Sequence, residues 1–94
     1  MTTKISPQAF IHEHASIGEG VVVEPFSYIG PHVTIGPRTY IGPNVSILES
    51  TTIGADCKIF PGAVIGAEPQ DLKFKDENTT VEIGDRTTIR ECVT

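Results

Sequence analysis

Residues 29–47 read IGPHVTIGPRTYIGPNVSI, so that Ile-Gly-Pro recurs at every sixth position. The same six-residue spacing extends over most of the chain, with isoleucine or valine at position one of each hexapeptide. These positions are Ile5, Ile11, Ile17, Val23, Ile29, Ile35, Ile41, Ile47, Ile53, Ile59, Ile65, Ile83 and Ile89. No isoleucine of the chain lies off this lattice. An internal repeat of this regularity indicates a solenoid.

The other positions of the hexapeptide predict its shape. Position two is often glycine, position three holds six of the seven prolines, and position five is small or β-branched. A six-residue period with recurrent proline excludes a helix, whereas β-branched residues favour strands. Proline suits the first corner of a turn, and the next residue is often of a type that tolerates positive φ: Gly20, His32, Asn44, Asp56 and Gly62. Each hexapeptide is therefore predicted to be a short strand and a tight corner, with the isoleucine pointing inward.

Three such hexapeptides close a triangular coil, and successive coils stack at about 4.8 Å. The coils are predicted at 5–22, 23–40 and 41–58, with a fourth starting at Ile59. We therefore predict an all-β fold, a parallel β-helix of about four to five coils, in one domain over residues 1–94. Two outer columns follow from the step of one coil: Phe10, Tyr28, Ser46 and Val64 form one, and Ser16, Thr34 and Thr52 form the other. The aromatic start of the first column either packs on a neighbouring subunit or is simply exposed.

The repeat is interrupted between Ile65 and Ile83, where residues 67–80 are polar and charged. Since these two isoleucines are three hexapeptides apart, we expect the coil frame to be kept and this segment to form an external loop. Solenoids place insertions on one face, which is often the binding face. The segment is therefore the first candidate for a binding site.

Composition excludes several classes of function. The formal net charge of −5 argues against nucleic acid and against an anionic membrane surface as partners. Two cysteines do not make a disulfide framework. No apolar run approaches the roughly 18 residues of a membrane span, and the N-terminus has no apolar signal core. We expect a cytoplasmic protein without a cofactor.

The run PQDLKF (residues 69–74), followed by VEIGDRTTIRECVT (81–94), resembles the acyl-ACP–UDP-N-acetylglucosamine O-acyltransferase family. The N-terminal ISPQAFIHEHASIGEGVVVEPFSYIG (5–30) is similar to the start of the same family. The resemblance implies a left-handed β-helix and a homotrimer. It also implies transfer of a (3-hydroxy)acyl group from acyl carrier protein to the 3-hydroxyl of UDP-N-acetylglucosamine, the first step of lipid A synthesis.

The resemblance also assigns roles to residues of the QDLK motif. It implies that Asp71 accepts hydrogen bonds from hydroxyls of the glucosamine ring, that Lys73 lies near the substrate and that Gln70 is its neighbour in the site. The alternative is that all three are ordinary surface residues of a solvated loop. The histidine that serves the family as general base lies in a later coil, so no residue of these 94 is assigned as catalytic. We therefore expect the N-terminal segment of a longer chain, inactive alone, with the docking region for acyl carrier protein outside it.

The histidines and cysteines have other interpretations. His14 and His32 are three hexapeptides apart and fall in one corner column, where two imidazoles suit a metal ion. No third ligand is evident, so His12, His14 and His32 are interpreted as solvent-exposed corner residues and no metal is predicted. Cys57 falls in a small inward position, and Cys92 at a corner.

Two other functions stay open. One is a non-catalytic hexapeptide module that serves assembly, and the other is a different hexapeptide acyltransferase. The QDLK motif favours the UDP-N-acetylglucosamine acyltransferases over the second of these.

Overall fold

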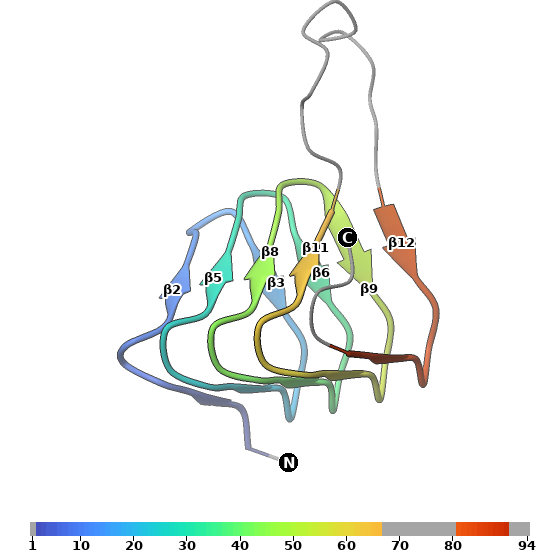
Figure 1. Ribbon diagram of the computed structural model, residues 1–94, viewed down its shortest axis with the longest axis horizontal. Coiled ribbons are helices and arrows are strands. Elements are labelled where there is room, and N and C mark those ends of the chain that lie inside the picture. Colours follow the sequence, from blue (N-terminus) through green and yellow to red (C-terminus); the bar gives the residue numbers. More distant parts are fainter. Residues whose placement is uncertain (1, 67–80, 91–94) are drawn as a thin grey trace, which may run out of the picture.

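The structure is a computed structural model that describes residues 2–66 and 81–90. Within these ranges the chain forms three parallel sheets, which face one another as the walls of a prism (Figure 1). The first sheet contains β1 (Lys4–Ile5), β4 (Val22–Val23), β7 (Tyr40–Ile41), β10 (Lys58–Ile59) and β13 (Thr88–Ile89). The second contains β2 (Phe10–Ile11), β5 (Tyr28–Ile29), β8 (Ser46–Ile47) and β11 (Val64–Ile65). The third contains β3 (Ser16–Ile17), β6 (Thr34–Ile35), β9 (Thr51–Ile53) and β12 (Val81–Ile83).

The strands follow one another around the three sheets in strict rotation, so that β1 to β12 make four coils and β13 begins a fifth. Each of the strands β1 to β8 pairs with the strand three hexapeptides further along the chain, as Ile5 does with Val23 and Ile29 with Ile47. Both outer columns predicted from the sequence are confirmed. The predicted parallel β-helix of four to five coils is therefore confirmed. The described residues form no helix that could cross a membrane.

The core is the stack of inward side chains predicted from positions one and five. Isoleucines 29, 35, 41, 47, 53 and 59 are fully buried, with at most 1% of each side chain exposed. A buried isoleucine contributes about 2 kcal/mol through removal of apolar surface from water. At position five the core accepts small polar residues because they are satisfied: Ser27 Oγ donates to the Gly42 carbonyl at 2.6 Å, and Thr39 Oγ1 to that of Gly54 at 2.8 Å. These hydrogen bonds join the side chain at position five to the backbone of the next coil, on the inner side of the wall.

The expected frame across residues 67–80 is wrong. Ile83 pairs with Ile53 in the third sheet, not with Ile65, which lies in the second. The paired residues are thus five hexapeptides apart, which is one coil of three hexapeptides plus two inserted ones. Strand β12 lies on the face that directly follows the face of β11, so residues 67–80 occupy the place of one corner in the chain order rather than that of one coil.

Most corners have a residue with positive φ at position four, as predicted, but the residue types are broader than expected. Asn44, Asp56 and His32 adopt φ near 60°, and so do the bulkier Phe26 and Arg38. A left-handed conformation costs about 1–2 kcal/mol for such side chains. The corners tolerate this cost because the backbone N–H at this position reaches the neighbouring coil, as Asp56 N–H does in donating to the Pro37 carbonyl at 2.9 Å.

Candidate functional site

Gly66, which follows β11, and Val81, which begins β12, lie at the edge between the second and third sheets. In the preceding coils this edge consists of the corners 12–14, 30–32 and 48–50. We call these three corners, together with Gly66 and Val81, the loop edge. It is the candidate functional site because the predicted binding residues belong to the segment that starts and ends on it.

The two ends of the segment are fixed to the third coil. Leu48 N–H donates to the Ile65 carbonyl at 2.8 Å, and Val81 N–H donates to the Ser50 carbonyl at 3.3 Å. Gly66 has a φ of 126°, and a Cβ there would lie 2.8 Å from Leu48 Cβ and 2.9 Å from Thr51 Oγ1. Only glycine fits this exit point, because both the backbone conformation and the space exclude a side chain.

The residues that the sequence assigned to sugar binding, Gln70, Asp71 and Lys73, lie outside the described residues. Their roles therefore stay predictions. The structure places the point where their segment attaches, at Gly66 and Val81.

All three histidines lie on the loop edge. The rings of His12 and His14 are 5.3 Å apart and those of His14 and His32 are 5.7 Å apart, which confirms the predicted corner column. His14 and His32 are exposed as expected, and His14 Nε2 lies 3.6 Å from a Glu13 carboxylate oxygen. His12 differs from the expectation: it is partly buried, and its Nδ1 accepts a hydrogen bond from His14 N–H at 3.0 Å. Among the described residues no group of three or more ligating side chains could hold a metal ion.

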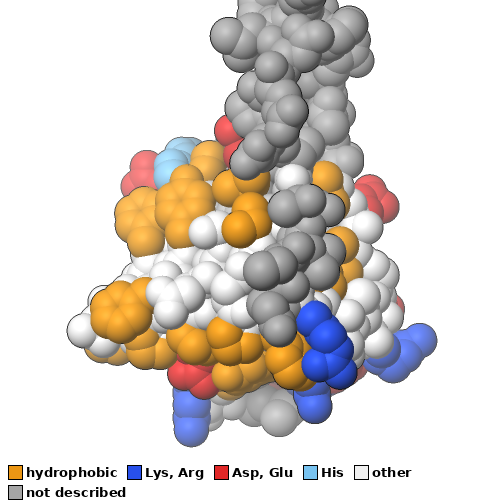
Figure 2. Space-filling model, viewed as in Figure 1, with side chains coloured by type: hydrophobic (Ala, Val, Ile, Leu, Met, Phe, Trp, Pro, Cys, Tyr) orange, Lys and Arg blue, Asp and Glu red, His pale blue; other side chains and the backbone are white. Residues whose placement is uncertain are grey.

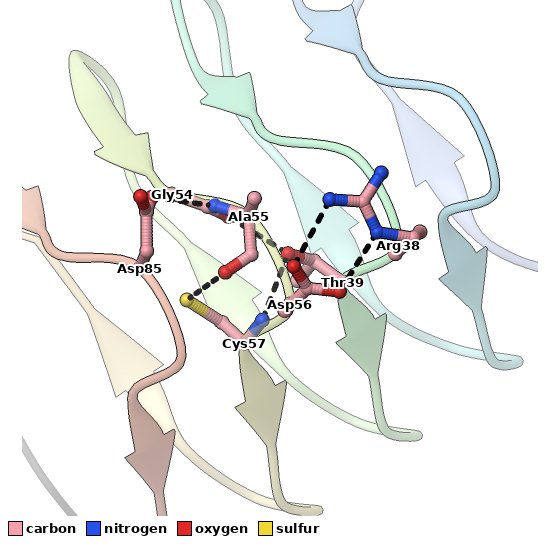
Figure 3. Close-up of polar contacts among 7 residues, drawn as sticks. All are labelled: Arg38, Thr39, Gly54, Ala55, Asp56, Cys57 and Asp85. Atoms are coloured by element: carbon pink, nitrogen blue, oxygen red, sulfur yellow. Dashed lines mark hydrogen bonds and ion pairs between the residues drawn. The ribbon is translucent and has the colours of Figure 1, made fainter.

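The edge between the third and first sheets carries an ion pair that the sequence interpretation missed (Figure 3). The Arg38 guanidinium donates to both carboxylate oxygens of Asp56, at 2.9 and 3.0 Å. The hydrogen bond from Arg38 lowers the pKa of Asp56 and, in return, raises the pKa of Arg38. The sequence contains a signal for this pair, since the opposite charges of Arg38 and Asp56 lie three hexapeptides apart and therefore in one corner column. The bidentate geometry ties the second and third coils together.

Cys57 lies beside this pair, in the inward position that the sequence predicted (Figure 3). It is buried, and its thiol donates to the Gly84 carbonyl, with a sulfur–oxygen distance of 3.1 Å. Asp85 Oδ1 accepts from Ala55 N–H at 2.9 Å on the outer side. These contacts join the third and fourth coils. Cys92 lies outside the described residues.

The outer face of the second sheet begins with an exposed aromatic pair. Phe10 and Tyr28 are 53% and 39% exposed, and their rings stack at 5.4 Å between centroids with only 6° between the planes. Figure 2 shows hydrophobic side chains gathered over β2 and β5 on this face. The pair is adjacent to the loop edge, since the Phe10 ring meets that of His12 edge-on at 6.4 Å.

A family model described as bacterial transferase hexapeptide (six repeats) matches residues 14–49 and 32–67. Two curated relatives are named acyl-(acyl-carrier-protein)–UDP-N-acetylglucosamine O-acyltransferase. The protein from Vibrio campbellii is 72% identical and the one from Chlorobaculum parvum is 52% identical, each over 92 residues, which is 98% of this chain and 35% of the relative. The chain thus spans about a third of the length of the curated relatives it matches.

Solved structures agree with the sequence comparison. A UDP-N-acetylglucosamine acyltransferase from Bacteroides fragilis matches with a TM-score of 0.84 and 56% identity, covering 92% of this chain and 34% of the other. A UDP-N-acetylglucosamine O-acyltransferase from Moraxella catarrhalis matches with a TM-score of 0.85 and 41% identity, covering 97% and 35%. Such structures are left-handed β-helices, and a coil of the opposite hand would not superimpose on them. The predicted handedness is therefore confirmed.

Proposed function

Because this chain belongs to the bacterial transferase hexapeptide family, we propose that it forms part of an enzyme that moves an acyl group from acyl carrier protein to UDP-N-acetylglucosamine. The 72% identity to the acyltransferase of Vibrio campbellii carries this proposal. The match covers 92 of the 94 residues, so it includes the segment with Gln70, Asp71 and Lys73. Hexapeptide repeats alone would not distinguish one acyl acceptor from another.

In the proposed reaction the 3-hydroxyl oxygen of the sugar attacks the thioester carbonyl of a (3-hydroxy)acyl chain. A carbon–oxygen bond forms, the carbon–sulfur bond breaks, and the hydroxyl proton passes through a general base to the departing thiolate. Asp71 accepts hydrogen bonds from sugar hydroxyls, which suits an ionised carboxylate because it is only an acceptor. Lys73 and Gln70 supply donors beside it. This reaction would be the first step of lipid A synthesis, in the cytoplasm, where both substrates occur.

The relatives are about three times as long as this chain, and we propose that these 94 residues act as the N-terminal segment of a longer protein. None of the three histidines is assigned as the base. His12 Nδ1 is already an acceptor for a backbone N–H, and all three lie in the first two coils, whereas the segment with the predicted binding residues follows β11 in the fourth coil. The base and the docking region for acyl carrier protein are expected in the remainder of that protein.

The direct test is an acyl-transfer assay with the protein encoded by the complete gene. It is incubated with UDP-N-acetylglucosamine and a series of 3-hydroxyacyl carrier proteins, and O-acylated nucleotide sugar is measured by mass spectrometry. UDP-glucose is the control acceptor. Absence of O-acylated product with every chain length would overturn the proposal.

Asp71→Ala tests the assigned binding residue. We expect kcat/KM for UDP-N-acetylglucosamine to fall by about 100-fold, as for loss of hydrogen bonds to a charged group. Asp76→Ala, at another aspartate of the same segment, is the matched control and should stay within about threefold of the parent, in the range of a surface substitution. Equal losses in the two variants would remove Asp71 from the site.

A homotrimer is also proposed, in which the stacked Phe10 and Tyr28 pack against a neighbouring subunit. Their exposure on one face supports this, since exposed apolar patches mark interaction surfaces. Phe10→Ser should convert the trimer to monomer in light scattering at micromolar concentration. Tyr40→Ser, at an aromatic residue on the outer face of the first sheet, should leave the trimer intact. A Phe10→Ser trimer would place the interface elsewhere.

A further inference from the structure

The corner N–H groups of the β-helix form hydrogen bonds along its axis. From the second coil onward, the N–H at position four donates to a carbonyl of the preceding coil. Examples are Asn44 to Pro25 at 3.3 Å, Ser50 to Pro31 at 3.1 Å and Arg86 to Ala55 at 2.8 Å. Each of these donors has positive φ, which turns the peptide at the corner toward the axis.

In the first coil these partners are missing, because β1, β2 and β3 are the end strands of their sheets among the described residues. Three side chains take their place. Gln8 N–H donates to Ser6 Oγ at 3.1 Å, His14 N–H to His12 Nδ1 at 3.0 Å, and Gly20 N–H to Thr3 Oγ1 at 3.0 Å. All three corners of the end coil are thus capped, as the free N–H groups at a helix N-terminus are.

The capped corners also differ in backbone conformation. Gln8 and His14 are not among the described residues with positive φ. Their corners are instead closed locally, with Ala9 N–H donating to the Ser6 carbonyl at 3.0 Å and Ala15 N–H to the His12 carbonyl at 2.9 Å. These two corners depend on the side chain two residues earlier.

Among the three capping side chains, only the His12 imidazole loses its acceptor atom when it gains a proton. Its Nδ1 accepts a hydrogen bond only when the imidazole is neutral with its proton on Nε2. A proton on Nδ1 would face the His14 N–H, donor against donor. The charged and titratable groups around it are His14 in the same corner, Glu13 beside it and His32 in the corner above.

We propose that His12 makes the end coil of this β-helix acid-sensitive. Protonation of its imidazole releases the His14 N–H and loosens the corner 12–14, while the corners capped by Ser6 and Thr3 stay closed. The loop edge therefore begins at a corner that opens when this imidazole gains a proton.

The test is amide hydrogen exchange by NMR at pH 7.5 and pH 5.0, corrected for intrinsic exchange rates. We expect the protection factor of the His14 amide to fall by about fivefold on acidification, as for loss of one hydrogen bond. The Gln8 amide is the internal control and should keep its protection. Nitrogen-15 shifts at pH 7.5 should show His12 protonated on Nε2 alone.

His12→Asn supplies the matched variant, because an asparagine oxygen caps the N–H two residues on without titrating. In this variant the protection of the His14 amide should not depend on pH. His14→Asn, which removes a neighbouring imidazole but not the cap, should keep the pH dependence at residue 14. A pH-independent parent, an equal fall in His12→Asn, or a His12 imidazole protonated on Nδ1 at pH 7.5 would each overturn the proposal.

Discussion

Gly36 lies against the backbone of the next coil, and the absence of its side chain is what permits that approach. A Cβ there would lie 2.5 Å from the Gly54 carbonyl carbon and 2.7 Å from Ala55 N. Both are backbone atoms, so neither can move without shifting a whole coil. We expect Gly36→Ala to lower the free energy of unfolding by about 3 kcal/mol, the upper range for overpacking, as measured by urea denaturation.

Gly84→Ala is the control for that substitution. It occupies the same position of the repeat, but a Cβ there meets no atom within 4 Å among the described residues. It should be neutral or stabilise by about 0.5 kcal/mol, because alanine restricts the unfolded chain. Equal losses at both positions would show that the space against the next coil does not set the cost.

The Arg38–Asp56 pair predicts a pH dependence with a defined sign. The pKa of Asp56 is lowered by its hydrogen bond from Arg38. The pair therefore contributes stability above the unfolded-state pKa of about 3.9 and loses it as pH falls through the lower folded-state pKa. Asp56→Asn, which tolerates the positive φ at this corner, should have a lower Tm than the parent at pH 6 and the same Tm near pH 2.

The difference in Tm should be small and should shrink in 1 M NaCl, since both side chains are nearly half exposed. A difference that is equal at pH 6 and pH 2 would show that the substitution acts through shape and not through charge.

At the scale of strands and segments, the structure makes residues 67–80 a separable insertion. Ile83 lies five hexapeptides after its partner Ile53, which is two hexapeptides more than the three of one coil. Deletion of residues 69–80 would leave the hexapeptide Ile65-Gly66-Ala67-Glu68-Val81-Glu82 before Ile83. We expect this deletion variant to keep the far-ultraviolet circular dichroism spectrum and cooperative unfolding of the parent, because the inward period is restored. In the complete protein it should abolish binding of UDP-N-acetylglucosamine, measured by calorimetry.

Deletion of residues 69–79, one residue fewer, is the control. It shifts the side-chain phase, so that Ile83 would point outward. This variant should lose cooperative unfolding in its C-terminal coils. If the two deletions behave alike, the register of β12 is not set by chain length.

The strands and their stacking could be predicted from the sequence because inward isoleucines mark the wall directly. The position of β12 could not, because a count of three hexapeptides from Ile65 does not say on which sheet the chain returns. The hydrogen bond from His14 N–H to His12 Nδ1 was also missed, since it depends on the conformation of that corner and not on residue type. The roles of Gln70, Asp71 and Lys73 depend on tertiary placement and on a ligand, neither of which a repeat pattern contains.

For the whole molecule, the solenoid makes stability depend on how many neighbours a coil has. Ile41 has coils on both sides and is fully buried, whereas Ile5 in the end coil is 41% exposed. Ile11 and Ile17 in the same end coil are only partly buried. The end coil is therefore held by one interface and by its three side-chain caps, and it is expected to open without the rest.

This gradient predicts the exchange behaviour of the native protein. Backbone amides of residues 29–59 should be protected at least about a hundredfold more than those of residues 5–17, because end units open locally. Hydrogen exchange with mass spectrometry at pH 7.5 measures this.

In the same protein, Ile41→Val should lower the free energy of unfolding by about 1 kcal/mol, and Ile5→Val should leave it unchanged within error, since its side chain is already exposed to water. Uniform protection along the chain, with equal effects of the two substitutions, would mean that the coils unfold as one unit and that the end coil does not open separately.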